Sequence, residues 1–249
     1  MVHLDRKLIL IGIGVVIILA TFGLDYWYNY TNPVTEITEF SLPKTTPNPH
    51  RIYNYYKDGN LVGTYEQTLE PTAEGYTAAV KINVSPEGNK YIVESLLTVD
   101  KQVAPIRYNV NATINDVSSS ISLKPNGTSY TLTYKAKTNS TNFNLETTKP
   151  IVLIDNNHPT HWELILTGLS LDPGKRYSFK AIVPQQNQIV ALEIVQSDKI
   201  QNVYVEGVYY NCTVIYENNY DLKFYFSNGE LVLFQNQSQN LEIRLSSSS

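Results

Sequence analysis

Residues 75–100 read GYTAAVKINV-SPEGN-KYIVESLLTVD, and this stretch decides the fold. The even-numbered side chains from Tyr76 to Val84 are all apolar, whereas Thr77, Lys81 and Asn83 lie between them. This period of two predicts a β-strand with one buried face. Residues 85–89 contain Pro and Gly, which favour a turn, and a second apolar segment follows. The stretch therefore predicts two antiparallel strands joined by a short turn.

The same alternation recurs along the chain, separated by turn signals such as Lys57-Asp58-Gly59-Asn60, in which Asp-Gly tolerates positive φ. Short turns between strands spaced about ten residues apart favour antiparallel over βαβ topology. We predict a mostly β fold, in which a long antiparallel meander forms a curved sheet or half-barrel. The further expected strands are 51–56, 61–69, 105–114, 119–124, 129–138, 176–183, 188–197, 207–217, 221–227 and 231–235.

One helix is expected to interrupt this pattern and to cover the sheet. Residues 161–171, HWELILTGLSL, have apolar side chains at near-helical spacing, and Asp172-Pro173-Gly174 ends the segment. Thr160 and Glu163 have the spacing of a capping box, in which each side chain bonds the backbone of the other residue.

The N-terminal residues have the features of a membrane anchor. Residues 8–24 are uncharged and mostly apolar, Arg6 and Lys7 precede them, and Tyr26 and Trp27 follow. A helix of this length nearly crosses a bilayer core of about 30 Å, and the positive-inside rule places the N-terminus in the cytoplasm. We expect a cytoplasmic segment at 1–7, a single-pass anchor at 8–28 in the cell membrane and an extracytoplasmic β domain at 50–249. A cleaved signal peptide and a buried apolar helix are the alternatives.

Residues 29–49 are rich in Pro and Thr, which favours an extended stalk between anchor and domain. The part from Pro33 to Phe40 has the alternative of an edge strand. Glycosylation is expected outside the cell, because the chain contains Asn-x-Ser/Thr triplets that fall opposite the apolar strand faces or in turns. A triplet also occurs at Asn29, and the expected glycosylation sites are Asn83, Asn111, Asn126, Asn139, Asn211 and Asn236.

The composition excludes several classes of function. The net charge of -4 gives no basic patch for nucleic acid. Cys212 is the one cysteine, so a Cys-based metal site is excluded, and its place on an apolar strand face indicates a buried, inert thiol. The sequence contains no Gly-rich phosphate loop and no Gly-x-Ser-x-Gly element. We therefore expect no catalytic residue, no cofactor and no enzymatic activity.

One polar cluster leaves a weaker alternative, a metal-dependent hydrolase. It lies at the start of the expected helix, and its spacing matches no strong ligand motif. Turn formation, capping and packing explain the same residues, so no metal site is assigned. The cluster consists of Asp155, Asn156, Asn157, His158, His161 and Glu163.

Several short segments resemble exported LolA/LppX-like half-barrel domains of unknown function. They are YYKDGNLVGTY at 55–65 with Thr68 and Leu69, residues 97–101, residues 105–108 and the helix start at 155–163. The resemblance implies a curved antiparallel sheet with an apolar cavity, and characterised relatives carry lipids. It carries over no catalytic residue. The absence of a lipid-attachment Cys departs from the bacterial lipoprotein pattern.

Aromatic side chains on the apolar strand faces form either a plain core or the lining of a cavity. The expected lining residues are Tyr108, Tyr130, Tyr134, Tyr177, Phe179, Tyr210, Phe224 and Trp162. The leading hypothesis is a membrane-anchored, glycosylated domain that binds a lipid-like or other apolar ligand without catalysis. The alternative is a structural cell-envelope or surface-filament subunit with envelope proteins as partners.

Overall fold

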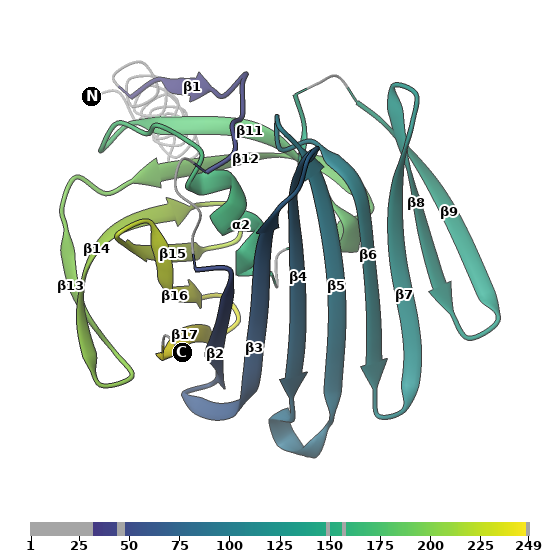
Figure 1. The fold of residues 1–249 in the computed structure, drawn as a ribbon, viewed down its shortest axis with the longest axis horizontal. Helices are drawn as coiled ribbons and strands as arrows, with labels where there is room; N and C mark the ends of the chain where they lie inside the picture. The colour runs from purple at the N-terminus through teal and green to yellow at the C-terminus, as the bar shows by residue number, and fades with distance from the viewer. Residues whose placement is uncertain (1–31, 44–47, 148–149, 156–157, 248–249) are drawn as a thin grey trace, which may run out of the picture.

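The computed structural model describes residues 32–43, 48–147, 150–155 and 158–247. Strands make up 64% of the described residues, and they form one large, open, curved sheet (Figure 1). The prediction of a mostly β fold with a curved sheet and one short helix is therefore confirmed.

The sheet is built from two antiparallel meanders that meet in its middle. The first runs from β2 to β9, and the second from β11 to β17. The last strand, β17, pairs with β2, so that the end of the chain joins the halves. The first meander consists of β2 (His50–Lys57), β3 (Asn60–Pro71), β4 (Gly75–Val84), β5 (Tyr91–Asp100), β6 (Pro105–Ile114), β7 (Val117–Asn126), β8 (Ser129–Ala136) and β9 (Asn139–Glu146).

The second meander contains two strands that the sequence analysis missed, β13 and β17. Its strands are β11 (Arg176–Val183), β12 (Gln188–Gln196), β13 (Gln201–Val205), β14 (Val208–Glu217), β15 (Leu222–Ser227), β16 (Glu230–Asn236) and β17 (Leu241–Ser247). Between the two meanders in sequence come β10 (Val152–Leu153) and the helix α2 (Pro159–Leu166), and β10 pairs in parallel with β11. Single-turn 3₁₀ helices η1 (Pro86–Gly88) and η2 (Pro184–Gln186) follow β4 and β11.

The predicted strand faces point as expected over most of the sheet. The even-numbered side chains of β4 from Tyr76 to Val84 are all buried. Cys212 is also fully buried, as predicted, and burial raises the pKa of its thiol to about 11. Val208 on the same predicted face is exposed, because it lies at the turn end of the β13–β14 hairpin (Figure 1).

The helix α2 lies in the hollow of the curved sheet and is buried along its whole length (Figure 1). It is shorter than the predicted 161–171 and ends at Leu166. The capping box was wrong: His158 is the N-cap residue, and it makes no side-chain capping bond. The helix is not amphipathic in the usual sense, because every one of its faces meets protein.

Part of the expected stalk belongs to the domain. Strand β1 (Val34–Glu36) pairs in parallel with β11, which is the edge-strand alternative. Phe40 is buried edge-on against Phe179, with ring centroids 5.6 Å apart. A Cβ on Gly168 would lie 1.9 Å from the carbonyl oxygen of Ser41, so glycine permits the close crossing of this segment and the chain after α2.

The expected cytoplasmic segment, anchor and first stalk residues, 1–31, lie outside the described residues. Among the residues that are described, we find no helix with the length and apolarity needed to cross a bilayer.

The position of β17 gives a test of the topology. A chain ending at Gln239 loses the strand that joins the two meanders, together with the buried side chains of Leu241, Ile243 and Leu245. Each large-to-small change in a core costs about 2–5 kcal/mol, so this loss approaches the whole stability of a domain. We expect the truncated domain to show no cooperative thermal transition by circular dichroism. A chain ending at Ser247 is the control, and cooperative unfolding of both chains at one temperature would contradict this topology.

Candidate functional site

The described part of the chain concentrates its buried polar side chains around α2. They form two groups. The Glu163 network comprises Arg51, Tyr65, Gln67, Thr160 and Glu163, and the Asp155 cluster comprises Ser95, Tyr108, Asp155, His158 and His161. Strands β2 to β6 and the helix supply most of these residues, so both groups bind the helix to the first meander.

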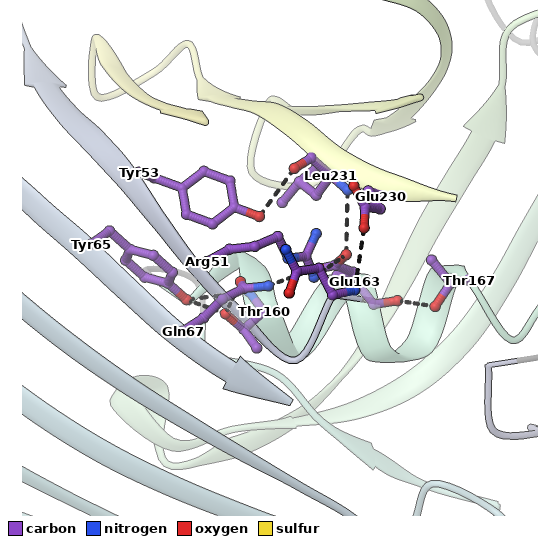
Figure 2. A network of polar contacts seen from close by, with 10 residues as sticks. Arg51, Tyr53, Tyr65, Gln67, Thr160, Glu163, Thr167, Glu230 and Leu231 are labelled. Carbon is purple, nitrogen blue, oxygen red and sulfur yellow. Dashed lines mark hydrogen bonds and ion pairs between the residues drawn. The ribbon is translucent and has the colours of Figure 1, made fainter. Parts of the chain in front are cut away.

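An ion pair is the centre of the Glu163 network (Figure 2). Arg51 Nη2 donates to Glu163 Oε1 at 2.7 Å, and the two side chains are 1% and 0% exposed. Burial by itself would lower the pKa of Arg51, but the adjacent carboxylate of Glu163 outweighs it and the pKa is raised. The guanidinium of Arg51 is therefore charged, and the pair is removed from water.

Further donors satisfy the carboxylate of Glu163. Gln67 Nε2 donates to Oε2 at 2.8 Å, and the backbone N–H of Leu231 in β16 reaches Oε1 at 3.3 Å (Figure 2). Glu163 thus connects α2 to strands of both meanders, β2 and β3 on one side and β16 on the other. Such additional hydrogen bonds stabilise the carboxylate side of the buried ion pair, whereas Nε and Nη1 of Arg51 are buried without a hydrogen-bond partner among the described residues.

The donor and the acceptor of each remaining hydrogen bond in the Glu163 network can be assigned by starting at the carboxylate of Glu163, which only accepts. Because Gln67 donates to Glu163, its Oε1 accepts from Thr160 Oγ1 at 2.5 Å. Thr160 Oγ1 then accepts from the hydroxyl of Tyr65 at 2.6 Å. Burial keeps the pKa of Tyr65 far above its ordinary value, so this hydroxyl keeps its proton.

The Asp155 cluster lies at the N-terminal end of α2. Asp155 Oδ2 accepts from Tyr108 at 2.5 Å and lies 3.5 Å from His158 Nδ1. Ser95 Oγ lies 3.1 Å from the same nitrogen. Burial lowers the pKa of His158 despite the opposing charge of Asp155, and it lowers the pKa of His161 to about 3. Both rings are therefore neutral at pH 7.

This arrangement does not make a catalytic relay. A Ser-His-Asp triad uses both ring nitrogens, one for the nucleophile and one for the carboxylate. Here Ser95 and Asp155 both approach Nδ1 of His158. Within the described residues, no group of three His, Cys, Asp or Glu side chains is placed to hold a metal ion. Asn156 and Asn157, which the sequence analysis put in this cluster, lie outside the described residues.

Several of the rings expected to line a cavity pack on the helix α2. Trp162 and Phe224 are in contact in the core, with ring centroids 5.0 Å apart, and Phe179 lies 6.2 Å from Trp162. Tyr108 packs on His161 at 5.6 Å. These rings therefore contact the helix or each other.

The remaining predicted rings lie elsewhere in the fold. Tyr130 and Tyr134 are on β8, where Tyr134 donates to the carbonyl of Pro184, and Tyr210 is half-buried on β14. Five surface grooves of about 350–540 Å³ lie on the described chain, and among the eight predicted rings only Tyr177 borders one of them.

The expected glycosylation sites divide by exposure. Asn83, Asn111, Asn126, Asn139 and Asn211 are exposed, so their modification stays a prediction that the fold permits. Asn236 differs from these sites: it is 2% exposed, and its Oδ1 accepts from Ser238 Oγ and the backbone N–H of Gln239, so the folded domain leaves this side chain little room for a glycan.

Sequence reasoning missed Arg51 and Gln67 as core residues, although a signal was present. Both residues lie at strand positions whose side chains face the core. Arg51 is two residues before the buried Tyr53, and Gln67 lies midway between the buried Tyr65 and Leu69. A charged residue in an apolar phase indicates a buried partner.

Three comparisons with known proteins identify no relative: no protein-family model, no curated protein and no solved structure matches this chain.

The ion pair gives a stability test. Glu163→Gln leaves the buried guanidinium of Arg51 without a counter-charge, and we expect it to lower the free energy of unfolding by about 3–5 kcal/mol. The double variant Arg51→Met with Glu163→Leu removes both charges and should recover part of this loss. Urea denaturation of all three chains measures the effect. A double variant less stable than Glu163→Gln would show that the charge imbalance is not the cause.

The buried histidines give a pH test. The pKa of His161 in the folded chain, about 3, lies below its ordinary value of 6.5, so the unfolded chain takes up the proton first as pH falls. The stability present above pH 6.5 is therefore lost on acidification, by about 2 kcal/mol at pH 5. Glu217, whose pKa burial raises to about 7, acts in the opposite direction.

Comparison with His161→Gln isolates the histidine, because Glu217 is present in both chains. We expect the variant to lose less unfolding free energy than the unmodified chain between pH 7.5 and pH 5 in urea titrations. Equal losses in the two chains would contradict the assigned role of His161.

Proposed function

We propose that this chain is a non-catalytic structural subunit of the cell envelope or cell surface. In this proposal a single-pass anchor at 8–28 holds it in the cell membrane with the N-terminus in the cytoplasm. The β domain lies outside, carries N-linked glycans on its exposed asparagines and makes contacts with other envelope proteins.

The observation that carries the proposal is the filled interior of the sheet. All eight residues of α2 are buried, and the Glu163 network fixes the helix to both meanders. The space in which a half-barrel would hold a ligand is thus occupied by the chain itself. What the domain leaves available to partners is its outer surface and its sheet edges, which are the contacts of a structural subunit.

Binding of a lipid-like ligand stays as the second candidate, favoured by the curved sheet and by the resemblance to half-barrel domains. It requires α2 to leave the hollow. That movement breaks the bonds of Glu163 to Arg51, Gln67 and Leu231, which leaves a buried charge unpaired. The structural role needs no such opening, and we therefore prefer it.

Recovery of the full chain from its native membrane in mild detergent separates the two candidates. We expect light scattering to give a mass above that of one chain plus its detergent, and mass spectrometry of the extract to give no apolar compound in stoichiometric amount. A monomer that carries one apolar molecule per chain would overturn the structural role.

A further inference from the structure

Strand β9 is a long sheet edge without a neighbour on its outer side. It pairs with β8 along its whole length, from Ala136↔Asn139 to Ser129↔Glu146. In the part of the chain that the structure describes, no strand pairs with its other side. Seven of its eight side chains are exposed, and Leu145 is half-buried. Figure 1 shows β9 at the outer limit of the first meander.

The two ends of the sheet differ in how they are protected. At the opposite end, β11 is covered by β1 and β10, which are only three and two residues long. Short edge segments resist pairing with another chain. Strand β9 lacks most of the usual protection, since NSTNFNLE contains no Pro and no Lys, its one charged residue is Glu146 at its end, and its pairing with β8 has no bulge.

The turn before β9 determines which backbone groups point outward. Lys137 and Thr138 form a two-residue hairpin loop, with a φ of 53° at Lys137. In such a hairpin the flanking pair, Ala136 and Asn139, is hydrogen-bonded, and the bonding direction then alternates. The odd-numbered residues of β9 therefore bond to β8. The N–H and C=O groups of the even-numbered residues, from Ser140 to Glu146, face outward.

We propose that β9 pairs antiparallel with β9 of a second copy of this chain, centred on Phe143. The inference rests on the proposed structural role and names the partner. Outward groups must meet outward groups, and directly opposite residues in a sheet share a face. The register that uses all the outward groups sets Phe143 against its own copy. Its other pairs are Asn142 with Asn144, Thr141 with Leu145 and Ser140 with Glu146.

Charge favours this arrangement over a parallel one. Glu146 is the one charged residue of β9. An in-register parallel pair would place the two Glu146 carboxylates side by side, which is destabilising. The antiparallel pair places them at opposite ends, roughly 20 Å apart at about 3.3 Å per residue. Each carboxylate then lies opposite the hydroxyl of Ser140.

Phe143 gives the pair an apolar centre. Its side chain is 37% exposed and lies edge-on to Tyr134, with ring centroids 5.6 Å apart. In the proposed register Phe143 is at a non-hydrogen-bonded position, where opposite side chains are closest. Pairing therefore covers the exposed part of the ring with its copy. The predicted glycan at Asn139 does not obstruct the pairing. Asn139 lies outside the paired residues, and a strand side chain stands perpendicular to the sheet rather than over its edge.

Cysteine crosslinking of the full chain in detergent tests the register. Phe143→Cys brings two thiols to directly opposite positions, within the 4.4–6.8 Å Cα separation of a disulfide, about 5 Å in such a pair. Thr141→Cys is the matched control, since Thr141 is exposed on the same face but lies roughly 13 Å from its copy. Both cysteine chains also carry Asn139→Gln, because Thr141 completes the Asn-x-Thr triplet at Asn139 and its replacement would otherwise change the glycan in one chain alone. After mild oxidation and denaturing electrophoresis, we expect most of the Phe143→Cys chain as a covalent dimer and the Thr141→Cys chain without a crosslink.

A proline substitution in β9 tests the pairing without a crosslink. The N–H of Asn142 faces outward, so Asn142→Pro removes bonds to the second copy and none to β8. We expect it to raise the dimer dissociation constant at least tenfold, whereas Asn142→Ala leaves the constant within twofold of the unmodified chain. Thermal melts of both variants verify that the domain stays folded.

The failures of the two proposals are distinguishable. An assembly that persists in Asn142→Pro, or that crosslinks as readily through Thr141→Cys as through Phe143→Cys, overturns the β9 pairing and leaves the structural role standing. An unmodified chain that is monomeric at every concentration in detergent overturns both.

Discussion

The buried ion pair between Arg51 and Glu163 is the interaction on which the rest of the structure depends. It joins the first long strand of the domain to the helix that lies between the two meanders. Two charges without water are stable only while each has the other, so the helix cannot move without leaving an unpaired charge. The contact of Glu163 with Leu231 extends this constraint to the second meander. One carboxylate thereby fixes the position of three separate parts of the chain.

This constraint has a consequence for the kind of function the domain can perform. A curved sheet with an empty hollow has room for a ligand. The hollow of this sheet is instead occupied by its own helix, all of whose residues are buried. The aromatic side chains that alternation predicts on the inner faces, such as Phe179 and Phe224, are used to pack that helix through Trp162. In the proposed structural role, the contacts with partners are made by the outer faces and the edges. The longest free edge in the described residues is also the most polar strand of the sheet, β9.

Much of the fold follows from the sequence, because alternation reports directly which side chains face the core. The inward phase of β4 and the burial of Cys212 were predicted correctly. The final strand was missed although Leu241, Ile243 and Leu245 alternate with polar residues. Strand β9 could not be found this way: both of its faces are largely exposed, so no apolar phase marks it.

The polar centre was the least predictable part, for a physical reason. Thr160 and Glu163 have the spacing of a capping box, and the same spacing places both side chains on one face of a helix. Local sequence cannot tell whether that face meets the helix backbone or a strand a hundred residues away. The deciding partners, Arg51 and Gln67, are distant in sequence and become visible only when the sheet is assembled.

Hydrogen–deuterium exchange tests most directly whether α2 is a fixed part of the core. If the ion pair holds the helix in place, the backbone amides of residues 162–166 exchange only when the whole domain unfolds, with the same protection as the central strands. Exchange of these amides at the rate of the exposed turn at 237–240, with the strands still protected, would show that the helix opens independently and would contradict the account.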